Sequence, residues 1–263
     1  MKKHYYRKSL LQWLIILAVI PFTLQMANAA PISSFSTANG WTQFADDDGV
    51  GSNGYVNPGW GGQAFDAEYL FYKLDGNTLS LGLQAGFDLE TGKVVHSGKN
   101  YWAGDLALSF DGDASNYEYA VDFGLLTKDY NQNFVGGPTG INPAGLYSVT
   151  AWNTGVYYGF TSSNPFAMDS GDLKGVLSAN ISGDDYAGGD LSYYRIVSFN
   201  LSDIGIVADN GFALDGHWTM SCGNDAINGK TEIAPVPEPA SMLLLGTGLV
   251  GLAGICERKR RRK

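Results

Sequence analysis

Acidic residues in turn-like stretches are the first candidates for chemistry in this sequence. Asp46 and Asp48 belong to "DDDGVGSNG", and Asp111 and Asp113 flank a glycine in "FDGDASN". Carboxylate and amide oxygens in such loops are the ligands that Ca²⁺ takes. Neither stretch has EF-hand spacing, and each could instead be a solvated loop or a polar hairpin turn. We therefore expect no cofactor, and Ca²⁺ at one or both of these stretches is the alternative.

Aromatic residues in glycine-rich or loop-like stretches could stack on sugar rings. Four residues meet this description: Trp41, Tyr55, Trp60 and Trp102. The alternative is that they pack over the ends of a β core, where aromatic side chains are common. They make a carbohydrate-binding, lectin-like module the alternative function.

Catalysis finds little support in the sequence. Beyond the first 29 residues the only histidines are His96 and His217, and H-E-x-x-H, G-x-S-x-G and paired Cys/His zinc spacings are absent. Cys222 falls on an apolar strand face, where a thiol is expected to be buried and inert. We expect no enzyme activity. Paired carboxylates keep a polysaccharide hydrolase open as a less favoured alternative.

The elements that would position these residues read as short strands. In "YLFYKLDGNTLSLGLQAGF" two alternating runs flank Asp75-Gly76, a strong hairpin signal. Further strands are predicted in "DLALSFDGDASNYEYAVDF", "LYSVTAW", "GVYYGF", "YYRIVSFNL" and "FALDGHWTMSC". The last places Asp215, His217, Thr219 and Ser221 opposite its apolar face. This pattern predicts an all-β antiparallel β-sandwich of jelly-roll or lectin-like type over residues 30–233.

Charge is distributed unevenly along the chain. The net charge is −9, but ten of the 17 basic residues lie before residue 10 or after residue 256. The body keeps seven basic and 25 acidic residues, a formal charge of −18. Such a body repels nucleic acid, so we expect none as a partner.

Both ends of the chain read as targeting segments. Residues 1–29 combine a basic start, an apolar stretch and the A-x-A pattern of Ala27 and Ala29, which predicts a signal peptide cut by signal peptidase. Residues 234–263 begin with "PVPEP", an extended spacer. An uncharged run at 240–256 follows, which as a helix would be about 26 Å long, just enough to cross a bilayer core. A basic end completes the segment: Arg258, Lys259, Arg260, Arg261, Arg262 and Lys263.

This C-terminal arrangement resembles the PEP-CTERM sorting signal. The resemblance rests on Pro237, Glu238 and Pro239, on the short span and on the basic end, which would stay cytoplasmic. It implies recognition by an exosortase-like membrane protease or transpeptidase. The protein would be anchored transiently in the inner membrane of a Gram-negative bacterium that makes extracellular polysaccharide. A plain tail anchor is the alternative.

Segments of the body also resemble exosortase-dependent surface proteins, among them "NPGWGGQAFDAEYLFYK", "AGDLALSFDGD" and "HWTMSCGND". This resemblance implies the class of protein and its location in the cell, but it supplies no catalytic residue. We therefore expect a non-catalytic protein of the cell surface or extracellular matrix, associated with exopolysaccharide and biofilm.

Overall fold

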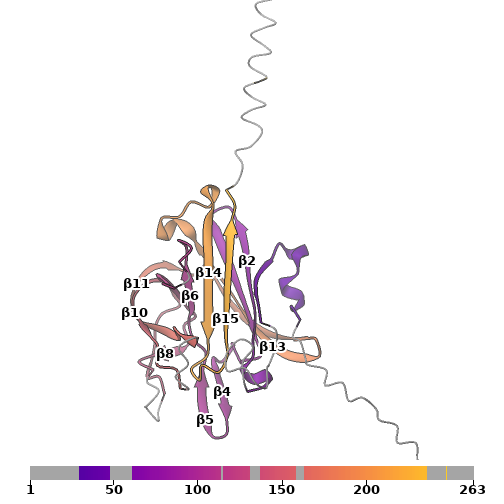
Figure 1. Cartoon of the computed structure of the whole chain (residues 1–263), viewed down its shortest axis with the longest axis vertical. Helices are drawn as coiled ribbons and strands as arrows, with labels where there is room; N and C mark the ends of the chain where they lie inside the picture. Colours follow the sequence, from indigo (N-terminus) through magenta and orange to yellow (C-terminus); the bar gives the residue numbers. More distant parts are fainter. Residues whose placement is uncertain are drawn as a thin grey trace, which may run out of the picture.

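The computed structural model describes residues 30–47, 61–113, 115–130, 137–157, 163–235 and 247. Their regular structure is almost entirely antiparallel β-sheet, in two layers that face each other (Figure 1). None of the helices in the described part of the chain is long and apolar enough to cross a membrane. The predicted signal peptide, and the predicted span apart from Thr247, lie outside the described residues.

One layer is a five-stranded sheet with the strand order β1-β2-β3-β13-β12. Its strands are β1 (Thr42–Asp46), β2 (Ala67–Asp75), β3 (Thr78–Ala85), β12 (Ala179–Ala187) and β13 (Asp190–Asn200).

The second layer is a six-stranded sheet with the order β11-β10-β7-β6-β14-β15. Its strands are β6 (Leu106–Ser109), β7 (Tyr119–Asp122), β10 (Gly145–Asn153), β11 (Ala167–Val176), β14 (Phe212–Thr219) and β15 (Ala226–Ile233).

Smaller elements complete the described fold. Two two-stranded sheets are formed by β4 (Lys93–His96) with β5 (Lys99–Trp102) and by β8 (Leu126–Lys128) with β9 (Gly140–Ile141). Short 3₁₀ helices are η1 (Ser33–Phe35), η2 (Thr37–Asn39), η3 (Gln63–Phe65), η5 (Leu201–Ile204) and η6 (Ala208–Asn210).

The main hydrophobic core lies between the two large sheets. From the first sheet it takes leucines such as Leu79, Leu81 and Leu83, and from the second it takes Leu108 and Trp218. Period-2 alternation sends these side chains inward, as the sequence predicts. The antiparallel β-sandwich is confirmed.

The predicted hairpin at Asp75-Gly76 is confirmed, with Asp75 paired to Thr78 and Tyr72 to Leu81. Gly76 has φ +56°, a left-handed conformation that suits glycine in a tight turn. The predicted pairing of the stretches around Leu108 and Tyr119 is also present, as β6 against β7.

One predicted strand is not found in the structure, and two observed strands were not predicted. Residues 155–157 of "GVYYGF" form no strand, and residues 158–160 lie outside the described part. Strands β11 and β12, which the sequence reading missed, lie at sheet edges and carry several glycines and aspartates. Neighbouring strands in the chain mostly pair within one sheet, so the strand order does not support jelly-roll connectivity.

The polar face of β14 is buried as well as its apolar face. His217 contacts the carbonyl oxygen of Pro165 through Nε2 (3.0 Å) and Asn228 Oδ1 through Nδ1 (2.7 Å). The Thr219 hydroxyl donates to the carbonyl of Asp225 (2.6 Å). Hydrogen bonds therefore compensate for burying a face that a simple two-layer sandwich would leave in water.

The core position of Leu81 predicts a large effect of truncation. Leu81→Ala should lower the free energy of unfolding by about 2–5 kcal/mol, because it leaves a cavity between the sheets. Leu173 on edge strand β11 is 49% exposed, so Leu173→Ala should cost less than about 1 kcal/mol. Equilibrium unfolding in urea compares the two, and equal losses would contradict the assigned core.

Candidate functional site

Four buried carboxylates gather at the end of the sandwich where β2 and β15 begin. Asp47 follows β1, Asp66 precedes β2, Glu68 lies in β2 and Asp225 precedes β15. The side chains of Asp66 and Asp225 are wholly buried, and the other two nearly so. We call these four residues the acid cluster.

Hydrogen bonds bring the acid cluster together from both sheets. The amide of Asp47 donates to the carbonyl of Glu68 (3.0 Å). From the other sheet, Asp225 Oδ2 accepts from the amide of Ala67 (2.8 Å). Residues 66–68 are therefore held between Asp47 on one side and Asp225 on the other.

Glu68 is fully satisfied by neutral donors. Its Oε1 accepts from Gln63 Nε2 (2.7 Å) and the Ser192 hydroxyl (2.8 Å), and its Oε2 accepts from Gln84 Nε2 (2.6 Å). Burial still raises the pKa of Glu68, although these hydrogen bonds oppose the shift. Glu68 thus fixes three neighbours in place and has little capacity left for a ligand.

Asp225 is occupied in the same way. Its Oδ1 accepts from the amide of Ala226 (2.8 Å), and its Oδ2 from that of Ala67. Burial raises the pKa of Asp225 well above its ordinary value, and the charges of Asp47 and Asp66 add to the shift.

Asp66 is different, because neither of its carboxylate oxygens has a hydrogen-bond partner among the residues that the structure describes. Burial is the main reason that its pKa is raised to about 8. The negative charges of Glu68, Asp47 and Asp190 contribute to the same shift. With its pKa raised to about 8, Asp66 holds a proton at neutral pH.

No basic side chain in the described ranges forms a salt bridge with the acid cluster. The salt bridge that these ranges contain joins Lys230 to Asp215 (3.6 Å), outside the cluster. The described residues also contain no group of three or more His, Cys, Asp or Glu that could hold a metal ion. With Glu68 and Asp225 engaged by N–H and O–H donors, Asp66 is the member whose oxygens are unoccupied.

The predicted Ca²⁺ stretch at Asp46 and Asp48 borders this cluster. Asp46 itself is exposed and accepts a hydrogen bond from Gln43 Nε2 (3.0 Å), while Asp48 lies outside the described residues. The buried neighbour Asp47 joins the cluster instead. Sequence reasoning found the acidic stretch that contains Asp47 but did not identify Asp66, Glu68 or Asp225.

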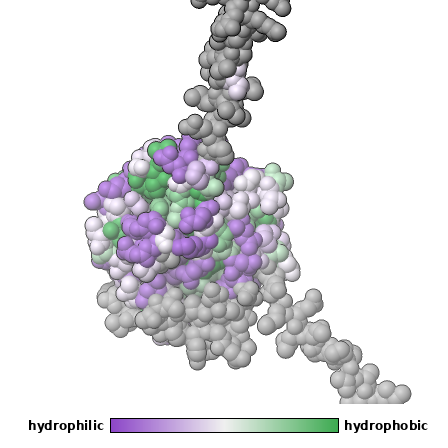
Figure 2. All heavy atoms as spheres, turned by 45° about the horizontal axis from the view of Figure 1, so that its top comes forward, coloured by the Kyte–Doolittle hydropathy of each residue, from purple (hydrophilic) through white to green (hydrophobic). Residues whose placement is uncertain are grey.

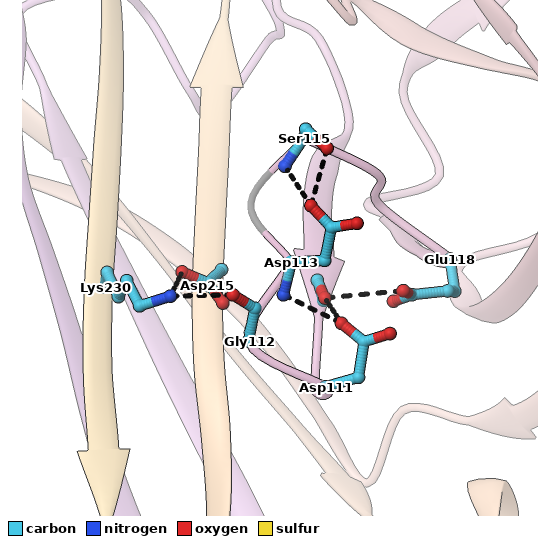
Figure 3. A network of polar contacts seen from close by, with 8 residues as sticks. Asp111, Gly112, Asp113, Ser115, Glu118, Asp215 and Lys230 are labelled. Atoms are coloured by element: carbon cyan, nitrogen blue, oxygen red, sulfur yellow. Dashed lines mark hydrogen bonds and ion pairs between the residues drawn. The ribbon is translucent and has the colours of Figure 1, made fainter.

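The other predicted Ca²⁺ pair, Asp111 and Asp113, lies in the exposed turn between β6 and β7 (Figure 3). Asp111 Oδ1 accepts from the amide of Asp113 (2.8 Å) and the Ser109 hydroxyl (2.9 Å), and these bonds lower the pKa of Asp111. Asp113 Oδ1 accepts from the amide and hydroxyl of Ser115. Both carboxylates stabilise their own turn, and a Ca²⁺ role for them stays a prediction.

A separate polar contact anchors this turn to the sheet. Lys230 on β15 donates to the carbonyl of Gly112 (2.7 Å) and pairs with the buried Asp215 of β14 (Figure 3). On the other side, the Ser109 hydroxyl also reaches Glu118 Oε1 (3.4 Å). The turn is therefore bound to β15 through Lys230 and to the end of β6 through Ser109, which favours a structural role.

The two described aromatic residues proposed for sugar stacking are buried. Trp41 is 8% exposed and packs edge-on against Phe35 at 5.1 Å between ring centroids. Trp102 is 7% exposed and packs against Tyr130 at 5.9 Å. Neither offers a ring face to a sugar here, because both complete aromatic clusters. Tyr55 and Trp60 lie outside the described residues.

Fold and chain end together describe an all-β domain followed by a proline-rich tail. Residues 235–261 match the PEP-CTERM protein-sorting motif, so the chain carries this sorting motif, as its sequence predicts. The motif implies export, membrane transit toward the cell surface, and processing by the membrane enzyme exosortase. No curated protein and no solved structure matches the chain.

The matched range contains Pro237, Glu238, Pro239 and part of the basic end. These residues, like the predicted signal-peptidase site at Ala27 and Ala29, lie outside the described residues. Their individual roles therefore stay predictions.

Asp66 should make stability depend on pH in metal-free buffer. Its pKa is raised from 3.8 to about 8 on folding, so its stabilising contribution is fully present below about pH 3.8 and is lost as the pH rises through about 8. Asp66→Asn removes the titrating group and should flatten this decline. Thermal unfolding across that range measures it, with Asp46→Asn as the exposed control. An unchanged slope in the Asp66 variant would contradict the assignment.

Proposed function

We propose that this chain is an exported, non-catalytic protein that an exosortase-like enzyme cuts at its C-terminal signal and delivers to the surface or extracellular matrix of a Gram-negative cell. The observation that carries the proposal is the PEP-CTERM motif at residues 235–261, directly after the last strand. Before the cut, residues 240–256 anchor the protein in the inner membrane. Association with exopolysaccharide and biofilm belongs to the same proposal.

The junction between domain and tail supports processing at this position. Strand β15 ends at Ile233, and the next residues, Ala234 and Pro235, are exposed. Strand β15 ends at one end of the sandwich (Figure 1). A membrane enzyme can therefore reach the tail without unfolding the sheet.

The surface around the end of β15 mixes polar and apolar side chains. Figure 2 shows hydrophobic and hydrophilic residues side by side at this end of the domain. Val207, between η5 and η6, is 53% exposed. Single exposed apolar side chains of this kind are ordinary on a protein surface that faces water, which agrees with a domain that is released from the membrane.

The protonation and the contacts of Cys222 and His217, two residues of types often used in catalysis, support the proposal that the domain is non-catalytic. Burial raises the pKa of the Cys222 thiol to about 12, so it is not a thiolate at neutral pH. Burial lowers the pKa of His217, and both of its ring nitrogens contact oxygen atoms of the protein. The carbohydrate-binding alternative rests on Tyr55 and Trp60, since the other two aromatic candidates are buried.

Changing the sorting signal should retain the protein in the inner membrane. Glu238→Ala removes the acidic residue of the Pro-Glu-Pro motif, and deletion of residues 258–263 removes the basic end. Both variants should remain in the inner-membrane fraction of the native host, as cell fractionation and immunoblotting would show. Glu232→Ala, an exposed acidic residue on β15, is the matched control and should reach the surface.

The intact mass of the surface form decides between sorting and simple anchoring. We expect a mass that lacks residues 1–29 and everything beyond the Pro-Glu-Pro region, with any added mass reporting attachment to another molecule. A surface protein that retains the tail through Lys263 would contradict exosortase processing.

A further inference from the structure

The acid cluster concentrates negative charge in the interior of the domain. In the described part of the chain no basic side chain forms a salt bridge with Asp66, Glu68 or Asp225, and all three are buried. Burying a charge without an opposite charge costs far more free energy than burying a neutral group. Asp66 is wholly buried, and neither of its carboxylate oxygens has a hydrogen-bond partner among the described residues. A positive charge placed beside the cluster would therefore stabilise the fold.

The first residues of the sandwich domain are bound next to this cluster. The carbonyl of Ala30 accepts a hydrogen bond from Gln84 Nε2 (2.8 Å), and the amide of Ile32 donates to Gln84 Oε1 (2.9 Å). Gln84 Nε2 also donates to Glu68 Oε2 (2.6 Å). One buried side chain, that of Gln84, therefore joins the start of the domain to an acid of the cluster.

Apolar packing fixes the same segment on the outer face of the five-stranded sheet. Ile32 and Phe35 are buried, and Phe35 stacks on Phe71 of β2 at 4.3 Å between ring centroids. Phe35 also packs on Gly82 of β3, where a Cβ atom would lie 2.3 Å from the ring. Residues 30–35 therefore belong to the folded domain, although they follow the predicted signal peptide directly.

Removal of the signal peptide changes the charge at this position. Hydrolysis of the peptide bond between Ala29 and Ala30 consumes one water molecule, leaves a carboxylate on Ala29 and gives Ala30 an α-amino group. The ordinary pKa of such a group is about 8, so it carries a proton at neutral pH. Its nitrogen belongs to the residue whose carbonyl binds Gln84. Only that residue and two hydrogen bonds separate it from Glu68 Oε2, which is a distance of about 9 Å at most.

We propose that the α-ammonium group of Ala30, which signal peptidase produces, is the positive partner of the acid cluster, so that removal of the signal peptide completes the polar interior of the domain. The proposal rests on the predicted export of the chain and on the cut after Ala29, and it does not depend on how the C-terminal tail is processed. Ala30 is only partly buried, so the ammonium group keeps contact with water and avoids the full cost of burial.

The charged side chains around this position act in the same direction. Asp47 after β1, Glu68 in β2 and Asp190 in β13 all act on Asp66, and Asp47 and Asp66 act on Asp225 before β15. All of these side chains are acids, so each of them attracts an ammonium group. Salt screens such an interaction little inside a protein, so one positive charge can stabilise several carboxylates together. The same attraction should hold residues 30–35 more firmly on the sheet after the cut.

The test compares the full chain in detergent before and after treatment with signal peptidase, with the new first residue read by N-terminal sequencing. The cut should raise the unfolding temperature by about 2–4 °C. The α-amino group of the cut protein should also react with an acetylating reagent at pH 7 at least about tenfold more slowly when folded than in urea. The reason is that neighbouring acids raise the pKa of the amine and so reduce its reactive neutral form. Mass spectrometry measures the acetylation.

Two variants and one control test the position of the charge. Insertion of two glycine residues between Ala29 and Ala30 keeps the ammonium group but moves it along the chain by about 7 Å, so both effects should be lost. Asp66→Asn removes an acid of the cluster and should reduce the gain in unfolding temperature. Asp185→Asn is the matched control. It removes an acid that contacts Ser33 of the same segment (3.3 Å) outside the cluster, so the gain should remain.

The outcomes separate this proposal from the proposed function. A cut chain that begins at Ala30 but melts like the uncut chain would overturn the proposal and leave export untouched. Equal gains in the wild type and in the glycine insertion would also overturn it, because the gain would not depend on where the charge lies. The insertion changes no residue of the folded domain, so it decides the question even if Asp66→Asn does not fold. A surface protein that retains residues 1–29 would contradict the predicted signal peptide, and this proposal with it.

Discussion

One hydrogen bond between the two sheets determines much of what happens at the acid cluster. The amide of Ala67, at the start of β2, donates to the carboxylate of Asp225, just before β15. The two residues are 158 positions apart in the chain, so this contact forms only when both sheets have assembled. It positions Asp66 and Glu68 inside the domain. The concentration of buried negative charge is thus a consequence of how the sandwich closes.

Burial of polar groups is a wider property of this fold. The outer face of β14, which a simple sandwich leaves in water, is covered and held by hydrogen bonds from His217 and Thr219. Arg195 on β13 is likewise buried and donates to the carbonyl oxygens of Leu89 and Phe123. Such satisfied networks require one arrangement of the chain, whereas Asp66 stands apart because nothing in the described residues satisfies it.

The sequence predicted those parts of the structure in which side-chain alternation is regular. Leu79, Leu81 and Leu83 identify a central strand because leucine alternates there with small or polar residues. Edge strands β11 and β12 have a neighbour on one side only and bury few side chains, so their pattern resembles a loop. The inward position of Asp47 was also not predictable, since a register shift between Gln43 and Ala45 changes which side chains face inward. The sorting motif was predictable because it is a linear signal, independent of tertiary contacts.

The direction of β15 gives the domain a fixed polarity. This strand starts beside the acid cluster and ends at the tail, eight residues later, which is a rise of about 26 Å. The acid cluster and the residues that follow β15 therefore lie at opposite ends of one strand. On the proposed function, cutting beyond Pro235 would leave the new C-terminus at the end of β15 that is far from the acid cluster. Any group joined to that terminus would then be about the length of β15 away from the buried acids.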